Sequence, residues 1–186
     1  MRSSVIQAAF FTGDYQRCCD LATAEALTGD VKSLWVRSLL HLGQFDEALS
    51  LASSEGALDS ALRLYASTFP LRNSEGRTKD GWNEGIFAET ERVTGLEGDR
   101  DEAAVLLAIV YSWGGRLGEA YRVAAQSASL EAQLLLVSFL TQIGRFDLAE
   151  EKMERLKRVF VEHVAFQLVE AQLTLQKVPS LVGPVE

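Results

Sequence analysis

Few residues in this sequence have the types and spacing that chemistry requires, and the most suggestive of them are glycines. The segment 114–118, GGRLG, has the glycine content of a loop that binds phosphate through its backbone N–H groups. Such a loop follows a strand and ends in lysine and serine, whereas this segment follows a helical pattern and has neither residue at its end. The glycines therefore indicate a turn between two helices.

Thiol and imidazole groups are equally scarce. Cys18 and Cys19 are adjacent, so a disulfide between them would need a strained ring, and we expect both to be free structural thiols. His41 and His163 lie far apart in the chain, and neither has the cysteine or carboxylate spacing of a zinc site. We therefore predict that the protein has no catalytic residue, no metal site and no cofactor, and that it is not an enzyme.

Composition narrows the class of protein further. The 186 residues include 18 Lys and Arg against 26 Asp and Glu, and the net charge of −8 argues against a nucleic-acid partner because it repels phosphate backbones. Hydrophobic residues make up 47%, which is enough for a packed core. No apolar run approaches the roughly 20 residues that span a bilayer, and residues 5–11 are too few for a secretory signal. We expect a cytoplasmic protein with no membrane insertion.

A six-residue pattern occurs four times along the chain and is the most informative feature of the sequence. Each copy starts with glycine, has a large apolar residue at its third position and ends in a small residue. The copies begin at Gly13, Gly43, Gly115 and Gly144. The glycines are separated by 30, 72 and 29 residues, and 72 is twice 36, so we infer a repeat of about 34 residues with one irregular copy.

The pattern predicts how each turn is built. Glycine ends a helix in the left-handed conformation, and the next polar residue, best represented by Asp14, caps the following helix. The large apolar residue fills the gap between the two helices, and the small residue lets their backbones approach closely. Runs with apolar residues three and four apart flank each copy, so the sequence predicts antiparallel helix pairs and an all-α fold.

We expect residues 1–186 to form a single array of about five helix pairs plus a terminal helix over 164–175. The irregular third pair has its helices at 58–66 and 86–93, with an inserted loop over 70–82 between them.

Proline and glycine residues after the terminal helix leave no room for a long partner helix. These residues are Pro179, Gly183 and Pro184. We therefore expect the chain to be the N-terminal part of a longer array.

The repeat resembles the tetratricopeptide motif. In the copy before and after Gly115, the residues at consensus positions are Leu107, Ala108, Tyr111, Ala120 and Ala124. Ala104 stands where that motif has tryptophan, and the proline that usually ends a repeat is missing, so the repeats are divergent. The resemblance implies a right-handed α-solenoid in which the first helix of each pair lines a concave face.

Residues 9–18, AFFTGDYQRC, and 143–156, IGRFDLAEEKMERL, resemble the epsilon-subunit family of coatomer, and residues 129–131, SLE, also fit it. This resemblance implies a non-catalytic subunit of the COPI vesicle coat in Golgi-to-ER retrograde and intra-Golgi transport. The implied partner is the C-terminal region of the coatomer alpha subunit, which it would bind and stabilise, with other coatomer subunits contacted indirectly. The implied location is cytoplasmic, peripheral on Golgi membranes and COPI-coated vesicles.

The concave face of such a solenoid is the predicted partner-binding groove, and here it is unusually apolar. It suits an extended or hairpin segment of another chain better than a small polar ligand. We predict Arg37 and Trp113 as its strongest contacts, because arginine and aromatic residues dominate interface energies. The predicted groove residues are Phe10, Phe11, Leu34, Arg37, Leu40, His41, Leu106, Ile109, Trp113, Leu135, Ser138 and Gln142.

Two alternatives remain open at the level of sequence. A tight superhelix would bury Leu106, Ile109 and Leu135 within its own core instead of presenting them to a partner. The chain could also be a general tetratricopeptide adaptor or cochaperone that binds short peptides. Against the cochaperone form, the positions that hold a peptide carboxylate with lysine and asparagine are occupied by Ser3, Gln7, Ser33 and Arg37.

Overall fold

The computed structural model describes residues 2–23, 28–52, 56–73, 82, 84–96 and 100–181, and within these ranges the regular elements are all helical. Consecutive helices form antiparallel pairs, followed by one further helix. The pairs are α1 (Arg2–Phe11) with α2 (Tyr15–Ala22), α3 (Gly29–His41) with α4 (Phe45–Leu51), α5 (Ala57–Thr68) with α6 (Glu84–Thr94), α7 (Arg100–Trp113) with α8 (Leu117–Ala124) and α9 (Leu130–Gln142) with α10 (Phe146–Phe160), and the further helix is α11 (Val164–Leu181). The chain is therefore an all-α helical repeat solenoid, as the sequence predicts.

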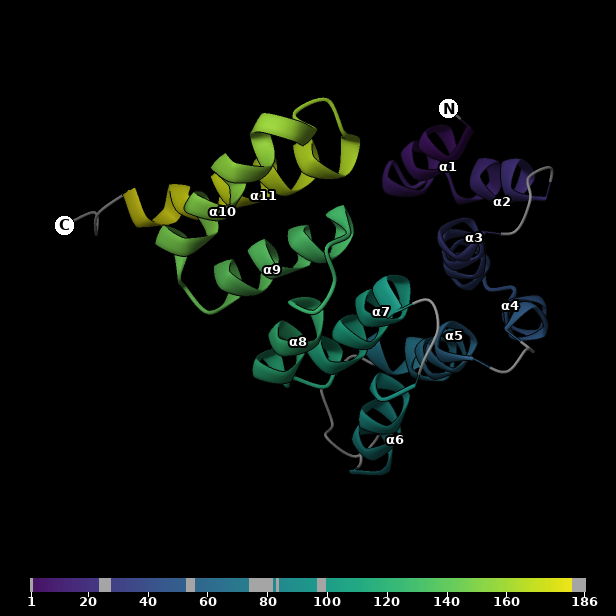
Figure 1. Cartoon of the computed structure of the whole chain (residues 1–186). Helices are drawn as coiled ribbons and strands as arrows, with labels where there is room; N and C mark the ends of the chain where they lie inside the picture. Colours follow the sequence, from purple (N-terminus) through teal and green to yellow (C-terminus); the bar gives the residue numbers. More distant parts are fainter. Residues whose placement is uncertain are drawn as a thin grey trace.

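The helices form two rows that curve together (Figure 1). The first helices of the pairs pack on one another in the order α1, α3, α5, α7, α9 and α11 and form the inner row. The second helices, α2, α4, α6, α8 and α10, pack outside them. The curvature brings α11 back to α1, with which it is in contact, so the inner row encloses a channel.

The turns inside the pairs have the geometry that the six-residue pattern predicts. In all four copies the glycine has a positive φ, between 78° and 81°. After α1, the N–H of Asp14 donates to the carbonyl of Ala9 at 2.9 Å and that of Gly13 to the carbonyl of Phe10 at 3.0 Å, and the other three copies have the same two bonds. This Schellman arrangement satisfies the last carbonyls of the helix and favours a residue without a Cβ atom.

The remaining positions of the pattern agree with the prediction in part. Asp14 caps α2, since its carboxylate accepts a hydrogen bond from the backbone N–H of Arg17. The small residues that end the four copies are fully buried, and they are Cys18, Ala48, Ala120 and Ala149. The large residues fill the gap less completely than expected, because three are half-buried and Phe45 is exposed.

The irregular third pair has longer elements than the sequence predicts. Helix α5 continues directly into a 3-10 helix, η1 (Phe69–Asn73), which occupies the start of the expected 70–82 loop. Residues 74–81 of that loop lie outside the described residues. Its last residue, Trp82, stacks on Phe87 of α6 with ring centroids 6.1 Å apart.

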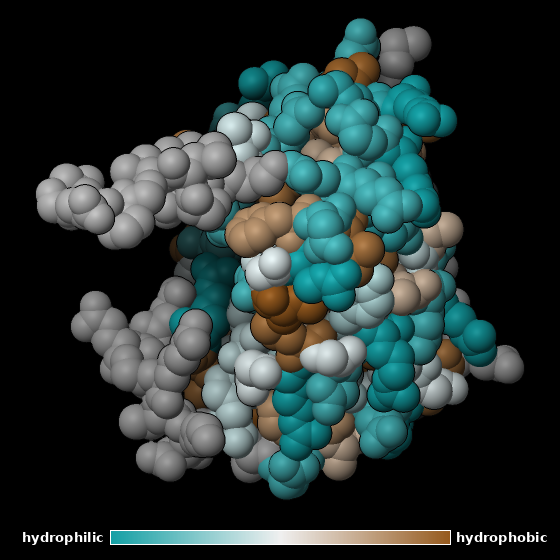
Figure 2. Space-filling model, turned by 90° about the vertical axis from the view of Figure 1, so that its left-hand side faces the viewer, coloured by the Kyte–Doolittle hydropathy of each residue, from teal (hydrophilic) through white to brown (hydrophobic). Residues whose placement is uncertain are grey.

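Surface polarity agrees with a solenoid whose apolar side chains are turned inward. The face shown in Figure 2 is mainly hydrophilic, with a small hydrophobic patch near its middle. Among the described residues, no helix has the length and hydrophobicity needed to cross a bilayer.

Replacing the turn glycine Gly144 with alanine tests the local architecture. Nothing lies within 4 Å of an added Cβ, so the cost comes from its φ of 78° alone. We expect Gly144→Ala to lower the free energy of unfolding by about 1 kcal/mol, measured by urea denaturation.

Gly118→Ala is the matched control, because Gly118 is exposed inside α8 and also has open space around it. There alanine should raise the free energy of unfolding by about 0.5 kcal/mol. A loss of the same size at both positions would contradict a specific role for the left-handed turn.

Candidate partner-binding channel

The channel inside the inner row is bridged by side chains of the chain itself. At the junction of α1 and α11, His163 Nε2 lies 3.2 Å from Gln7 Oε1, and the rings of Phe11 and His163 are 6.2 Å apart. Because His163 Nδ1 accepts a hydrogen bond from the N–H of Ala165, its proton resides on Nε2, which donates to Gln7. These contacts close the ring between its first and last inner helices.

A second bridge crosses the channel from α3 to α9. Arg37 is 6% exposed, its Nη2 lies 2.7 Å from Glu131 Oε1, and its guanidinium carbon lies 4.4 Å from the centre of the Phe10 ring. Burial disfavours the charged form of Arg37 and by itself would lower its pKa. The carboxylate of Glu131 and, to a smaller extent, Tyr65 favour the charged form more strongly, so the pKa of Arg37 is raised. Arg37 therefore remains charged and ties four inner helices together.

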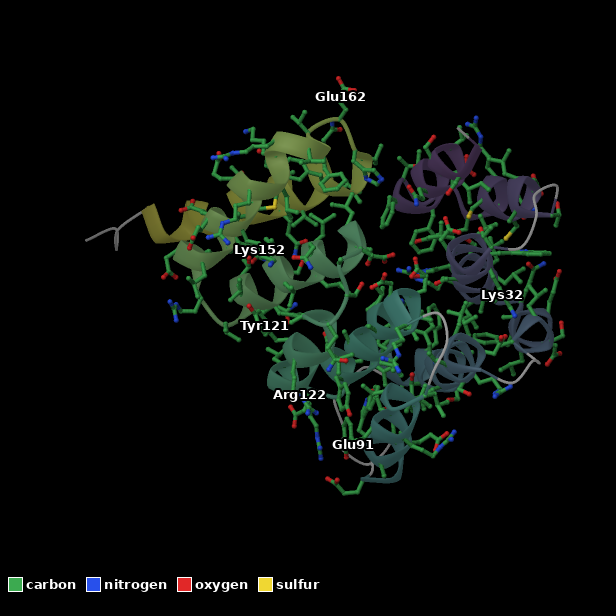
Figure 3. The ribbon with its side chains drawn as sticks, viewed as in Figure 1. Lys32, Glu91, Tyr121, Arg122, Lys152 and Glu162 are labelled. Carbon is green, nitrogen blue, oxygen red and sulfur yellow. The ribbon has the colours of Figure 1, made fainter. Side chains whose placement is uncertain are left out.

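Neighbouring repeats are also joined nearer the outside. Lys32 of α3, labelled in Figure 3, pairs with Asp59 in the first turn of α5 at 2.6 Å, with both side chains mostly buried. This pair fixes how the second repeat sits on the third.

The space left in the channel is a cavity of about 280 Å³. Its walls combine apolar side chains, including Leu34 and Val105, with the carboxylates of Asp30, Glu102 and Glu131. Burial opposes the charged form of Asp30, but Thr28 and Ser3 donate hydrogen bonds to its carboxylate. Because these bonds favour the charged form, the pKa of Asp30 is lowered. This volume is near the lower end of the range for ligand pockets, and the walls include carboxylates, so in this conformation the space is smaller and more polar than the apolar groove expected from the sequence.

The predicted groove residues divide by exposure. The buried ones are Phe10, Leu34, Arg37, Leu40 and Leu106. The half-buried ones are Phe11, His41, Ile109, Trp113, Leu135 and Ser138, and Gln142 is exposed.

Burial corrects the expected role of two of these positions in this conformation. Leu40 and Leu106 are 1% and 0% exposed, because neighbouring inner helices pack over them. Both belong to the main hydrophobic core, and direct partner contact at either residue would require the helices around it to separate. Ile109 and Leu135, in contrast, keep part of their surface.

Several predicted residues gather with others at the C-terminal ends of the inner helices. His41 stacks on Tyr15 with ring centroids 4.2 Å apart and meets the edge of Phe69 at 5.1 Å. Trp113 lies 4.8 Å from Tyr65 and 6.0 Å from Phe69. We call Tyr15, His41, Phe69 and Trp113 the aromatic cluster.

Sequence reasoning missed Phe69, Arg72 and His163. The first two belong to η1, where the expected loop carried no periodic signal. His163 lies in the turn before α11, and its contact with Gln7 depends on the curvature of the whole array. Tyr15 had a signal, since it occupies the large apolar position of the first six-residue pattern.

The imidazole of His41 is kept neutral by its surroundings. Burial lowers its pKa to about 4, and the charges of Arg72 and Arg37 act in the same direction. A neutral ring suits its stacked position between Tyr15 and Phe69.

Comparison with known proteins agrees with this geometry. The family model described as the coatomer epsilon subunit matches residues 5–180, which include the five helix pairs except the first three residues of α1, and most of α11. The chain belongs to the coatomer epsilon subunit family. A search of curated proteins gave no match.

Membership in the coatomer epsilon subunit family confirms the resemblance seen in residues 9–18 and 143–156. Coatomer is the protein component of the COPI vesicle coat, so the chain is a subunit of that coat and has protein partners within it. The inner row of helices is accordingly a candidate surface for a protein.

Breaking the ion pair across the channel should be costly. In Glu131→Gln the buried charge of Arg37 loses its carboxylate, so we expect the free energy of unfolding to fall by about 3 kcal/mol in urea denaturation. The matched control is Glu151→Gln, which removes the partner of Arg155 on the exposed surface of α10. That change should cost less than about 0.5 kcal/mol, and equal losses in the two variants would contradict a special role for the buried pair.

Stability should also depend on pH through His41. In the unfolded chain a histidine gains its proton near pH 6.5, whereas folded His41 gains it near pH 4. Below pH 6.5 the unfolded state therefore binds more protons than the folded state. The contribution of His41 to the free energy of unfolding is fully present above pH 6.5 and is lost as the pH falls towards 4.

Between pH 6.5 and 5 the free energy of unfolding should fall by about 1 kcal/mol less in His41→Gln than in the wild-type chain. This figure includes a discount for the solvent around a half-buried ring. His163→Gln is the comparison variant, since burial also lowers the pKa of His163. If urea denaturation showed the full wild-type pH dependence in His41→Gln, the assignment to His41 would be wrong.

Proposed function

We propose that this chain binds the C-terminal region of the coatomer alpha subunit with the inner row of its solenoid and stabilises it. In this role it acts in Golgi-to-ER retrograde and intra-Golgi transport, on the cytoplasmic side of Golgi membranes and COPI-coated vesicles. Its contacts with other coatomer subunits are indirect.

The observation that carries the proposal is the composition of the inner row where it is accessible. Half-buried apolar and aromatic side chains lie on inner helices of separate repeats, and they include Phe11, Ile109, Trp113 and Leu135. Phe11 also lines the cavity. Such a surface suits a segment of a protein partner better than a small polar ligand.

We propose further that the role is non-catalytic. Cys18 and Cys19 are buried, and burial raises the pKa of Cys18 and raises that of Cys19 to about 12. Both are therefore thiols at neutral pH, and a thiol is a poor nucleophile compared with a thiolate. The two cysteines act in packing between helices.

Binding to the purified C-terminal region of the alpha subunit, measured by calorimetry, tests the proposal. Trp113→Ala should weaken binding about tenfold or more, because a half-buried tryptophan is a typical interface anchor. Tyr121→Ala is the control, since Tyr121 is exposed on α8 in the outer row (Figure 3). It should leave the affinity unchanged.

Gln142→Arg offers a second test that does not disturb the core, because Gln142 is exposed at the end of α9. It should weaken binding while leaving the melting temperature unchanged. Failure of the wild-type chain to recover any alpha subunit from cell extract, at any salt concentration, would reject the proposed partner. Tight binding of isolated short peptides instead would favour a general adaptor.

A further inference from the structure

Arg72 is held in an unusual position beside the aromatic cluster. It belongs to η1, and its guanidinium carbon lies 3.8 Å from the centre of the Phe69 ring and 5.7 Å from that of Trp113. Its Nη2 is 3.5 Å from Nδ1 of His41. Side chains from α3, η1 and α7 thus fix one arginine at the C-terminal ends of the inner helices.

This arginine has no counter-charge among the described residues. Other cations, such as Lys32, Arg37 and Arg116, pair with carboxylates at 2.6–2.7 Å. Arg72 has no such pair within the part of the chain that the structure describes, and its Nε is buried without a hydrogen-bond partner. Burying part of a cation without an anion is costly, so its position is better explained by a partner that supplies the anion.

Among the described residues, Arg72 is an unpaired positive charge on a chain whose net charge is −8. The charged groups that act on His41, which faces Arg72, are Arg72 itself and Arg37. Because Arg37 is already paired with Glu131, Arg72 is the cation at this place that is left for an acidic ligand.

We propose that Arg72 and the aromatic cluster form a docking point for an aspartate or glutamate side chain of the bound protein segment. The planar guanidinium offers paired N–H groups to a carboxylate, and the half-buried rings of Trp113 and Tyr15 pack against the apolar neighbours of that residue. The inference deepens the proposed function, on which it rests, by naming the chemistry of the partner segment.

Trp113 adds a half-buried aromatic surface beside this charge, since its ring centre lies 5.7 Å from the guanidinium carbon of Arg72. A cation fixed against aromatic rings is also pre-organised, so little side-chain entropy is lost when it binds. The docking point thus combines charge complementarity with a rigid surface.

The test compares Arg72→Gln and Arg72→Lys with wild type in binding to the C-terminal region of the alpha subunit. We expect Arg72→Gln to weaken binding about tenfold and to reduce its sensitivity to salt between 50 and 300 mM, roughly the effect of losing one charge-assisted contact. Arg72→Lys should restore only part of the affinity, because lysine lacks the paired geometry. Arg92→Gln, which changes an exposed arginine on α6, should have no effect.

Melting temperatures separate binding from folding. If Arg72→Gln lowered the melting temperature but left the affinity of the alpha subunit unchanged, Arg72 would serve only the stability of this chain and the inference would be overturned. The proposed function would stand in that case.

A second arm of the experiment does not depend on the alpha subunit. A short peptide with a glutamate between leucines is compared with its glutamine twin by calorimetry. Preference of the wild-type chain for glutamate, lost in Arg72→Gln, would support the docking point even if the alpha subunit failed to bind. Equal affinity for the two peptides, with no effect of Arg72→Gln in either arm, would overturn it.

Discussion

The ion pair between Arg37 and Glu131 is the interaction on which the form of the channel depends. Helix pairs in a solenoid contact mainly their neighbours in sequence, so the curvature of the row is ordinarily the sum of small rotations between repeats. Here one buried arginine connects the second repeat to the fifth and stacks on Phe10 of the first. A single fixed distance across the ring therefore restricts the rotations of all the repeats between them.

This restriction explains why a protein of this kind can place side chains from distant repeats around one small space. The cavity receives carboxylates from α3, α7 and α9, and the aromatic cluster receives rings from the ends of several inner helices. In an unrestrained solenoid those groups would move apart with each change in curvature. For a coat subunit, a fixed inner surface favours lasting association with one partner over loose capture of many.

The local structure was readable from the sequence, and the long-range structure was not. Glycines at a regular spacing, each followed by a large and a small residue, specify a turn by backbone chemistry alone, and all four turns form as predicted. Leu40 and Leu106 show where this reasoning stops. Both lie on first helices of pairs, as the sequence predicts, but whether such a residue is open or covered depends on curvature, which no local pattern encodes. Arg72 was missed for a similar reason. The sequence of η1 has no helical period, and the role of Arg72 depends on side chains that are distant in sequence.

The contact between α1 and α11 differs in strength from the rest of the ring. Pairs such as α7 and α8 are held by continuous apolar packing, whereas this seam consists mainly of the Gln7–His163 hydrogen bond and the packing of Phe11. Because the weakest interface costs the least free energy to open, any opening of the ring would begin at this seam and would leave each helix pair intact. A polypeptide entering from the side would then enter no faster than the seam opens, and reclosure of the seam would lengthen the time that it stays inside.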